Sequence, residues 1–454
     1  MASPLTQGQL PADIFAQRRA QMMHLAGDDA VVIVPSAGMV SRNSDVEHDF
    51  RQSSDFFFLT GFDEPDALAV LRPGAEEPYV LFVRPRDKKA ETWTGRRAGV
   101  EGAQAVLGAD AAFAIDQLSS ELPGLIDGRT RLGYTWGARP ELDVTVVQAS
   151  RRHRLKPRDA FVGPDVTFDP NALLHEARLR KSAEEAAILR RSAAVTSEGH
   201  HEAMRLCAPG MAEYQLQAAL EYVFKADGAA RVGYSSIVAA GDNATILHYN
   251  TNRMRIDDGD LVLIDAGAEV DYYTTDVTRT FPANGRFTKP QRDVYEVVLT
   301  AQLASIDACV AGRPFRDSHN ISVRVLTEGM VDLGLLTGEI DELIETEAYK
   351  RYYMHRTGHW LGMDVHDVGA YLVDRAPRPL EAGMVTTIEP GLYIPLDDED
   401  APEALRGIGV RIEDDILVTD GAPENLTAAC AKTIDEVEAM CDTAPRWVKR
   451  SQQG

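Results

Sequence analysis

Short runs of apolar residues, separated by polar turns, dominate the first third of the chain. Four of these runs, DAVVIVPS, DFFFLTGF, ALAVLRP and YVLFVRP, are continuous enough to predict buried strands. Two later segments, VEGAQAVLG and IDQLSSELPGLI, have the spacing of helices. This alternation predicts an α/β domain, which ends at a linker, RHRLKPRDAFVGPDVTFDP, where Pro, Gly and Asp accumulate and periodicity lapses.

A long amphipathic helix is predicted after this linker, beginning at about Ser182. The Ser182 side chain can cap the first turn while Glu185 reaches back to complete a capping box, and apolar residues then recur at helical spacing through EEAAILRRSAAV. A chain of 454 residues is also too long for one ordinary core. We therefore expect an N-terminal domain over residues 1–175 and a C-terminal domain over 176–454.

Two pairs of strand-like runs in the C-terminal domain each carry two acids. LVLIDAG contains Asp265 and VTTIEPG contains Glu389, and each acid is followed by a Gly turn. A second run then carries Asp276, in TTDVTRTF, or Glu413, in GVRIEDDILV. Helical sequence precedes both pairs, which predicts an α+β fold of two pseudo-symmetric halves around one site.

Four inward carboxylates repel one another strongly in a low-dielectric cavity, so they either take up protons or hold cations. Two divalent cations would cancel four negative charges, which predicts a two-metal hydrolytic site. Each acid taken singly is better explained as a solvated strand-end residue. The recurrence of the same arrangement with apolar flanks favours the site. Oxygen-rich ligands with one histidine suit Mn, Co, Fe or Zn.

The histidines near the second acid pair are spaced as in some zinc proteases. His355 and His359 lie four residues apart, but Gly358 and Gly362 interrupt the segment and the glutamate of the HExxH motif is missing. A helical zinc protease is therefore not expected. Other histidines, His319 among them, have no motif context and are assigned no chemistry.

Composition limits the partners of the chain. With 47 basic and 70 acidic residues its net charge is −23, which argues against nucleic acid and against an anionic membrane surface as partners. The first residues, MASPLTQGQLPADIF, lack the charged start and apolar core of a leader, and no run approaches the roughly 20 apolar residues that span a bilayer. We expect a cytoplasmic protein. Its four scattered cysteines are expected to be reduced thiols.

Taken together, these segments resemble the Xaa-Pro aminopeptidases (aminopeptidase P) and prolidases, the proline-specific branch of the pita-bread metallopeptidases. The matching segments are ILHYN, LIDAG, DVTRTFP, MHRTGHWLGMDVHDVG, TIEPGLYI and GVRIEDDILV, in the order of the family, with RQSSDFFFLTGFDEPDA and ETWTGRR in the N-terminal half. The resemblance implies an aminopeptidase P-like N-terminal domain for oligomerisation and the cleft rim. It implies a C-terminal pita-bread domain whose pseudo-twofold halves surround a dinuclear metal site.

The resemblance also assigns metal ligands. Asp265 and Asp276 would hold one metal, with Asp276 also reaching the second, His359 and Glu389 would complete the second site, and Glu413 would bridge both. We expect two divalent ions per chain, most simply Mn, with Co or Zn as alternatives. A water shared by two such ions can lose its proton near pH 7 and attack the peptide bond. Glu389 would also shuttle the proton to the leaving nitrogen.

Further side chains are implied to contact the substrate. His248, His355 and His366 would line the cleft, and His248 and His366 would hydrogen-bond the scissile carbonyl or the oxyanion. Arg411 would orient ligand carboxylates, and Tyr393 would support it. Packing in a strand explains Tyr393 equally well.

Substrate choice depends on a wall for the proline ring and on a neighbouring subunit. His355, Trp360 and Val365 are candidates for the wall, although core packing explains the last two equally well. Asp45, in SRNSDVEHDF, and Trp93, in ETWTGRR, match positions that approach the cleft of a neighbouring subunit in aminopeptidase P. We therefore expect a homodimer or homotetramer in which a second subunit completes the site. The alternative for Trp93 is an ordinary packed tryptophan.

Three functions are compatible with these residues. The favoured one is a dimetal Xaa-Pro aminopeptidase that hydrolyses the bond between the first residue and a penultimate proline. The second is a prolidase, restricted to Xaa-Pro dipeptides, with the same metal site. The third is a metal-free binding module on the same fold, which the complete ligand set argues against.

Overall fold

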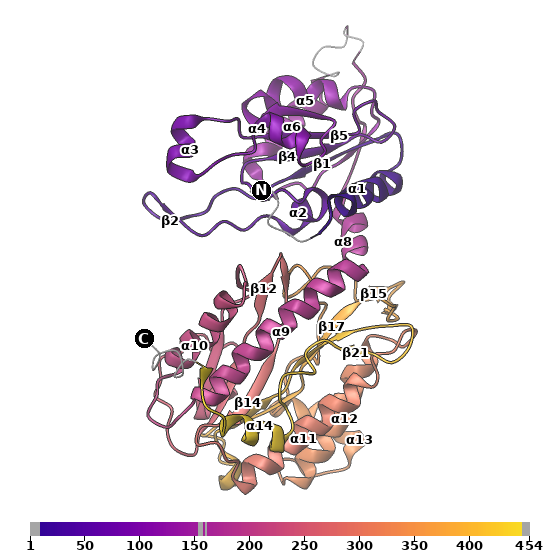
Figure 1. Ribbon diagram of the computed structural model, residues 1–454. Coiled ribbons are helices and arrows are strands. Elements are labelled where there is room, and N and C mark those ends of the chain that lie inside the picture. Colours follow the sequence, from indigo (N-terminus) through magenta and orange to yellow (C-terminus); the bar gives the residue numbers. More distant parts are fainter. Residues whose placement is uncertain (1–9, 153–157, 159–160, 447–454) are drawn as a thin grey trace. The chain divides into compact units, whose positions relative to one another are not determined.

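The computed structural model describes residues 10–152, 158 and 161–446. The chain divides into two compact units, Met1–Arg178 and Leu179–Gly454 (Figure 1). The first unit thus ends at residue 178, against an expected 175. Residues 153–157 and 159–160 of the expected linker lie outside the described residues. Within the described ranges, no helix is both long and apolar enough to cross a membrane.

The first unit contains a six-stranded sheet. In spatial order its strands are β6 (Ala111–Ala114), β5 (Tyr79–Val83), β4 (Leu68–Leu71), β1 (Ala30–Pro35), β7 (Arg131–Gly133) and β8 (Val166–Phe168). Strand β1 pairs antiparallel with β4, with Val32 opposite Leu71, and parallel with β7. Strands β4 and β5 are antiparallel, while β5–β6 and β7–β8 are parallel. The predicted runs DAVVIVPS, ALAVLRP and YVLFVRP are confirmed as strands of this sheet.

Short helices accompany the sheet. They are α1 (Ala12–Ala26), α2 (Ser54–Thr60), α3 (Lys88–Thr94), α4 (Gly99–Ala105), α5 (Leu118–Ile126), α6 (Pro140–Ser150) and α8 (Asn171–Leu179), with a 3-10 turn at Ile115–Gln117. A core of apolar side chains, including Val31, Phe82, Leu122 and Leu132, joins the sheet to α5. An exposed hairpin of β2 (Ser41–Asn43) and β3 (Val46–Glu47) lies apart from this sheet.

The prediction of a strand at DFFFLTGF is wrong, because this segment forms helix α2. The Ser53 side chain accepts a hydrogen bond from the backbone of Phe56 at the helix start, and Gly61, with φ of 63°, ends the helix in the left-handed conformation. Six of the seven helical residues are buried, so the helix is enclosed on nearly all sides. Periodicity alone does not separate such a buried helix from a buried strand. The Ser and Gly at its ends were the informative signals.

The second unit contains two halves, each of which begins with helices and continues into antiparallel strands. The first half comprises α9 (Ala183–Leu206), α10 (Glu213–Ala226), β9 (Arg231–Val232), β10 (Ile237–Ala240), β11 (Leu261–Asp265), β12 (Ala268–Val270), β13 (Tyr273–Thr274) and β14 (Thr278–Pro282). The second half comprises α11 (Lys289–Ile306), α12 (Arg316–Asp332), α13 (Ile340–Glu345), β15 (Leu372–Val373), β16 (Ala376–Pro377), β17 (Val385–Ile388), β18 (Gly391–Ile394), β19 (Ile408–Arg411), β20 (Asp414–Leu417), β21 (Glu424–Asn425) and α14 (Ile434–Cys441). Two helices thus precede the strands in the first half and three in the second.

Strand register places the acids at corresponding positions of the two halves. In the first half β11 pairs with β14, and Asp265 lies opposite Thr278 at the end of the pair. In the second half β17 pairs with β20, and Ile388 lies opposite Asp414. Glu389 therefore follows β17 directly, as Glu413 precedes β20. The pseudo-symmetry expected from the sequence is present in the order of elements.

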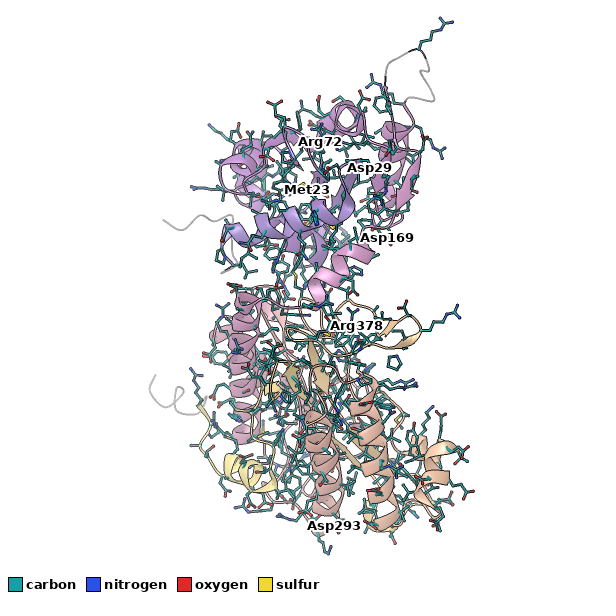
Figure 2. All side chains as sticks on the ribbon, turned by 90° about the vertical axis from the view of Figure 1, so that its right-hand side faces the viewer. Met23, Asp29, Arg72, Asp169, Asp293 and Arg378 are labelled. Atoms are coloured by element: carbon teal, nitrogen blue, oxygen red, sulfur yellow. The ribbon has the colours of Figure 1, made fainter. Side chains whose placement is uncertain are left out.

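Helices cover these strands. The capping box predicted at Ser182 and Glu185 is present, and α9 starts at the next residue. Helix α9 contacts β12 and β13, whereas α11 contacts β17, β18 and β19. The outer face of α11 carries Asp293, which pairs with Lys289 at 2.6 Å and extends into solvent (Figure 2). The inner faces of α9 and α11 thus pack against strands of the two halves.

Candidate metal centre

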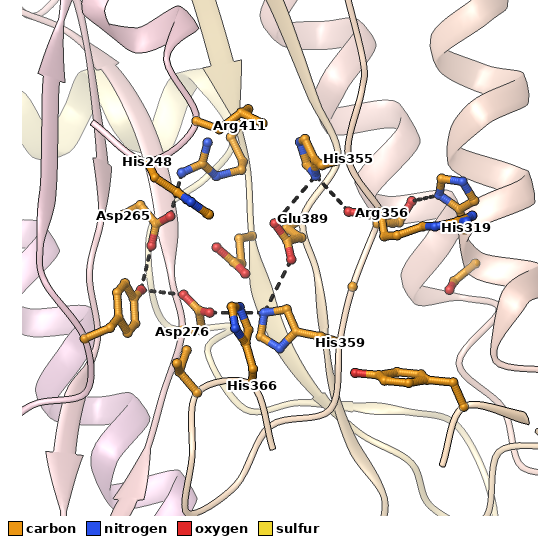
Figure 3. Close-up of a pocket in the computed structure, with 18 of the residues that line it drawn as sticks. His248, Asp265, Asp276, His319, His355, Arg356, His359, His366, Glu389 and Arg411 are labelled. Carbon is orange, nitrogen blue, oxygen red and sulfur yellow. Dashed lines mark hydrogen bonds and ion pairs between the residues drawn. The ribbon is translucent and has the colours of Figure 1, made fainter. Parts of the chain in front are cut away.

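A cavity of about 930 Å³ is lined by residues of both halves of the second unit. Strand ends and the loops beside them supply its polar lining (Figure 3). All five side chains expected to bind metal line it: Asp265, Asp276, His359, Glu389 and Glu413. The folded chain therefore collects residues from positions 265 to 413 into one site.

Asp265 and Asp276 are held by neutral and cationic donors. The Tyr234 hydroxyl donates to Oδ1 of Asp265 at 2.6 Å and also contacts Oδ1 of Asp276. Arg411 Nη2 donates to Oδ2 of Asp265 at 2.5 Å. A Cβ at Gly267 would overlap the carbonyl oxygen of Thr275, so the glycine after Asp265 permits the two acid-bearing loops to approach. Local sequence and side-chain donors thus fix the orientation of both carboxylates.

Glu413 is buried and faces the first half of the unit. Its Oε2 accepts a hydrogen bond from the Thr278 hydroxyl at 2.6 Å. Asp276, His359 and Glu413 each offer one ligand atom, and these three atoms lie within 4.8 Å of one another. One cation can therefore contact all three side chains.

The His359 ring is oriented by its own backbone neighbourhood. Its Nδ1 lies 3.0 Å from the carbonyl oxygen of Trp360, and a carbonyl only accepts, so Nδ1 carries a proton and Nε2 is the ring nitrogen that faces the carboxylates. Nε2 lies 3.4 Å from Oδ2 of Asp276 and 3.5 Å from Oε1 of Glu389. The Glu389 backbone N–H donates to the carbonyl of Thr357 at 2.7 Å. Both side chains point their ligand atoms at the same space.

Burial makes the negative charge of this cluster costly. It raises the pKa of Asp265, raises the pKa of Glu389 to about 7, and raises the pKa of Glu413 well above its usual range, with repulsion from neighbouring carboxylates adding to the effect at Glu413. Burial alone would lower the pKa of His359, but the hydrogen bond to Asp276 and the charge of Glu389 raise it to about 9. The cluster therefore attracts positive charge.

The donor set fits two divalent metal ions. Three buried carboxylates and the partly buried Glu389 share one paired arginine, Arg411, and the His359 ring among the residues that line the cavity. Carboxylate oxygens with one imidazole nitrogen suit Mn, Fe, Co or Zn, and no cysteine lines the described cavity. Two divalent cations would neutralise four carboxylates and remove the burial penalty.

A hydrogen-bonded chain runs beside the carboxylates. His355 Nε2 lies 2.8 Å from the Tyr393 hydroxyl, and Arg411 donates to the same hydroxyl at 3.2 Å. Arg411 Nε also donates to Thr278 at 3.1 Å. Tyr393 is only 1% exposed and burial raises its pKa to about 12, so it stays protonated at neutral pH. Tyr393 thus both packs and links the two polar residues.

His248 and His366 line the cavity and are exposed within it. The His366 ring packs edge-on against His359, with ring centroids 4.4 Å apart and an interplanar angle of 84°. His248 lies beside Asp265 and Arg411 (Figure 3). Both imidazoles are therefore open to a bound molecule.

One expected wall residue lies elsewhere. Trp360 does not line the cavity but is fully buried, stacked on Tyr371 at an interplanar angle of 8° and packed against Phe315. Its flat ring and apolar neighbours explain why the side chain packs in the core. Val365 lines the cavity as expected, and Phe315 and Tyr371 supply the aromatic surface instead.

Asp45 and Trp93 belong to the first unit. Asp45 lies in the turn between β2 and β3 and is exposed, while Trp93 lies on α3 and is 84% exposed. The alternative interpretation of Trp93 as an ordinary packed tryptophan is therefore wrong. The expected approach of both residues to the cleft of a neighbouring subunit stays a prediction.

Several contributing residues were missed at the sequence level. Tyr234 precedes β10 in RVGYSSIV, a segment without any motif signal. Asp415, two residues after Glu413, accepts the backbone N–H of Asp276 at 3.1 Å. His319 lines the cavity and its Nδ1 lies 2.9 Å from the Thr357 hydroxyl. Only Asp415, inside the IEDD run, had a sequence context that pointed to the site.

Two family models match this chain. Residues 187–420 match metallopeptidase family M24, and residues 15–133 match the N-terminal domain of aminopeptidase P. A curated relative, the Xaa-Pro aminopeptidase of Escherichia coli strain K12, is 42% identical over 94% of this chain and 97% of its own length.

Solved structures match over the same extent. An aminopeptidase of Pseudomonas aeruginosa is 49% identical with a TM-score of 0.94, covering 95% of this chain and 98% of the other. A zinc-substituted aminopeptidase P of Escherichia coli in complex with product is 42% identical with a TM-score of 0.92 and the same coverage. The expected two-domain fold is thereby confirmed.

Proposed function

The chain belongs to metallopeptidase family M24, and we propose that it is a metal-dependent Xaa-Pro aminopeptidase, which removes the first residue from peptides with proline in second position. The observation that carries this proposal is the convergence of four carboxylates, three of them buried, and His359 on one cavity. The relatives named above are aminopeptidases, so a prolidase with the same metal site is not favoured.

Asp265 and Asp276 would hold one ion, and His359 and Glu389 would hold the other, with Asp276 and Glu413 touching both. The arrangement of Asp276, His359 and Glu413 around one point supports this assignment. Two divalent ions bound there would polarise the scissile carbonyl and lower the pKa of a shared water. We propose Mn as the metal, because ligands rich in oxygen suit it.

We assign Glu389 the transfer of a proton from the attacking water to the leaving nitrogen. Oε1 of Glu389 accepts from the Thr387 hydroxyl at 3.3 Å, and Oε2 lies 3.8 Å from Nδ1 of His355. A carboxylate oriented by the Thr387 hydroxyl can accept the proton of the attacking water and return it to the leaving nitrogen. The proline nitrogen needs that proton, because an amine leaves far more easily than an amide anion.

The exposed imidazoles would bind the reacting carbonyl. His248 and His366 both line the cavity and both are exposed to it. Donors aimed at the position where negative charge develops stabilise the transition state more than the substrate. Arg411 already donates to Asp265 and Tyr393, so we assign it the orientation of a ligand carboxylate.

A bond before proline excludes most peptidases, because this tertiary amide has no N–H and the ring fixes φ. The cavity offers a mixed wall of imidazole and apolar surface instead of a backbone acceptor. Val365, Phe315 and Tyr371 line it together with His355. The proline ring can pack on this wall while the scissile carbonyl faces the carboxylates.

A comparison of two substrates tests the function. The protein, loaded with Mn, should hydrolyse an Xaa-Pro tetrapeptide and release its first residue, and should act more slowly on Gly-Pro. Preference for Gly-Pro by an order of magnitude would make it a prolidase. Absence of hydrolysis of both substrates, after loading with Mn, Co and Zn in turn, would falsify the peptidase proposal.

We further propose that a second copy of the chain narrows the cleft through Trp93 and Asp45. An exposed tryptophan on a short helix supports this, since 84% exposure of so large an apolar ring is unusual without a partner. Cytoplasmic location is likewise proposed, supported by four free cysteine thiols.

Trp93→Ala should change the ratio of activity on an Xaa-Pro dipeptide to that on a tetrapeptide, while the metal content and the melting temperature stay at wild-type values. Trp136→Ala is the matched control, because Trp136 is a second exposed tryptophan of the same unit, at 43%. Equal ratios in wild type, Trp93→Ala and Trp136→Ala would show that Trp93 does not control substrate length.

A further inference from the structure

Two arginines line the cavity away from the carboxylates. Arg316 is the first residue of α12, and Arg356 follows His355 directly. Both line the cavity and both are exposed. Within the described ranges, neither guanidinium lies within ion-pair distance of a carboxylate. Arg411, which also lines the cavity, pairs with Asp265, and Arg316 and Arg356 differ from it in this respect.

Positive charge concentrates at this end of the cavity. Burial, together with the charges of Arg356, Arg316 and Lys350, lowers the pKa of His319 to about 4. The charge of Lys350 is balanced by Glu347, whose carboxylate lies 2.6 Å from the ammonium group. The two arginines therefore remain as the source of positive charge. The whole chain carries a net charge of −23, so this is a local reversal of sign. A negatively charged group entering the cavity would be attracted here.

The carboxylates and Arg356 lie at different places along the cavity. Figure 3 shows Asp265 and Asp276 on one side, Glu389 between, and His319 with Arg356 on the other. His355, next to Arg356, lies 3.8 Å from Glu389. An extended peptide advances roughly 3.3 Å per residue. A substrate cleaved beside Glu389 therefore brings the residues that follow proline toward the arginines.

We propose that Arg316 and Arg356 form a cationic subsite that binds a substrate carboxylate downstream of the proline. The proposal rests on the proposed aminopeptidase function and names the peptides this enzyme prefers. A guanidinium binds a carboxylate through two parallel hydrogen bonds. The carboxylate has two sources, the C-terminus of a short peptide or an Asp or Glu side chain after proline. A peptide runs from ammonium to carboxylate, and this matches the polarity of the cavity, acidic at one end and basic at the other.

Four tetrapeptides separate these sources. They are Ala-Pro-Ala-Ala as the free acid, Ala-Pro-Ala-Ala amide, Ala-Pro-Glu-Ala amide and Ala-Pro-Lys-Ala amide. Wild-type kcat/KM should be higher for a peptide with a carboxylate than for the neutral amide by about two- to fivefold for each arginine engaged, mainly through KM. The preference should shrink when NaCl is raised from 50 to 500 mM, because salt screens exposed charges. A gain for the free acid alone identifies the C-terminus, and a gain for the glutamate peptide alone identifies the side chain.

Three variants test the residues. Arg316→Gln and Arg356→Gln should each lower the ratio of acidic to neutral peptide turnover, and Arg356→Glu should favour the lysine peptide instead. Arg313→Gln is the matched control, because Arg313 is exposed, lies three residues before Arg316 and does not line the cavity. Metal content and melting temperature are measured for every variant, and only variants at wild-type values are compared.

Equal turnover of acidic, neutral and lysine peptides by the wild-type enzyme overturns the subsite. An equal loss of preference in Arg313→Gln overturns it as well, since the effect would then be one of overall charge. Failure of the proposed function looks different, because the neutral amide would not be cleaved by any form of the protein.

Discussion

Tyr234→Phe isolates one hydroxyl group that two expected metal ligands share. The hydroxyl donates to Asp265 at 2.6 Å and contacts Asp276, while phenylalanine keeps the ring and leaves no cavity. Burial, with repulsion from Asp265 and Asp276, raises the pKa of Tyr234 well above its usual value, so it is a donor at neutral pH. The variant therefore loses a single hydrogen bond to a charged acceptor.

The expected size of the effect follows from that bond. A hydrogen bond to a charged group contributes about 1.5–3 kcal/mol, and one proton serves only one acceptor at a time. Loss of a residue that orients metal ligands typically lowers metal affinity by about 10–100-fold. We expect the Kd for Mn to rise within that range for Tyr234→Phe, and activity to recover as Mn is increased.

Calorimetric titration of the chelator-treated protein with Mn measures this affinity directly. Tyr134→Phe is the matched control, because the Tyr134 hydroxyl also donates to a carboxylate, Asp143 at 2.9 Å, in the unit that lacks the centre. Tyr134→Phe should lose stability but bind Mn as wild type does. A Kd for Tyr234→Phe within twofold of wild type would refute the reasoning, since the hydroxyl would then contribute nothing to ligand orientation.

The remaining predictions concern metal, catalysis and pH. Elemental analysis should find about two divalent ions per chain, chelation should abolish hydrolysis, and Asp276→Ala should lose both metal and rate. His248→Ala and His366→Ala should each lower kcat by about 100-fold or more with metal content unchanged, so loss of metal would make them ligands or supports. Burial lowers the pKa of His200 to about 3 and that of His201 to about 4 in the folded protein, both below their value of 6.5 when exposed. Below pH 6.5 the unfolded chain therefore binds more protons than the folded protein does. As the pH is lowered from 6.5 to 4, the free energy of unfolding should fall by up to about 1.4 kcal/mol per pH unit for each group. Denaturant unfolding at pH 7 and pH 5 measures this, and His201→Gln should reduce the slope, while an unaltered slope would contradict the assignment.

Sequence reasoning located the carboxylates because each follows a local rule. Asp265 and Glu389 end buried strands and precede a glycine turn, and this pattern is visible within seven residues of sequence. The start of α9 was likewise visible, because Ser182 and Glu185 form a capping box that depends only on their spacing. Features fixed by neighbours in the chain are recoverable from the chain.

Residues that act across the fold were not recoverable in this way. Tyr234 reaches Asp276 over 42 positions, and Asp415 reaches the same residue over 139. Nothing near Tyr234 in the sequence marks its partner. For Trp360 the sequence left a cleft wall and core packing as equal alternatives, and the ring lies in the core beside Phe315. Long-range packing decides such positions, and periodicity carries no information about it.

The contacts between halves imply that metal binding and folding of the second unit are coupled. Arg411 of the second half donates to Asp265 of the first, and Thr278 of the first donates to Glu413 of the second. Asp276 of the first half is held by Asp415 of the second. Each half therefore supplies donors that orient carboxylates of the other half, and bound cations would offset the cost of burying these carboxylates together. An ion that binds only the assembled site stabilises the folded state by about 2.7 kcal/mol at a free concentration of 100 Kd. We therefore expect metal binding to raise the stability of the second unit.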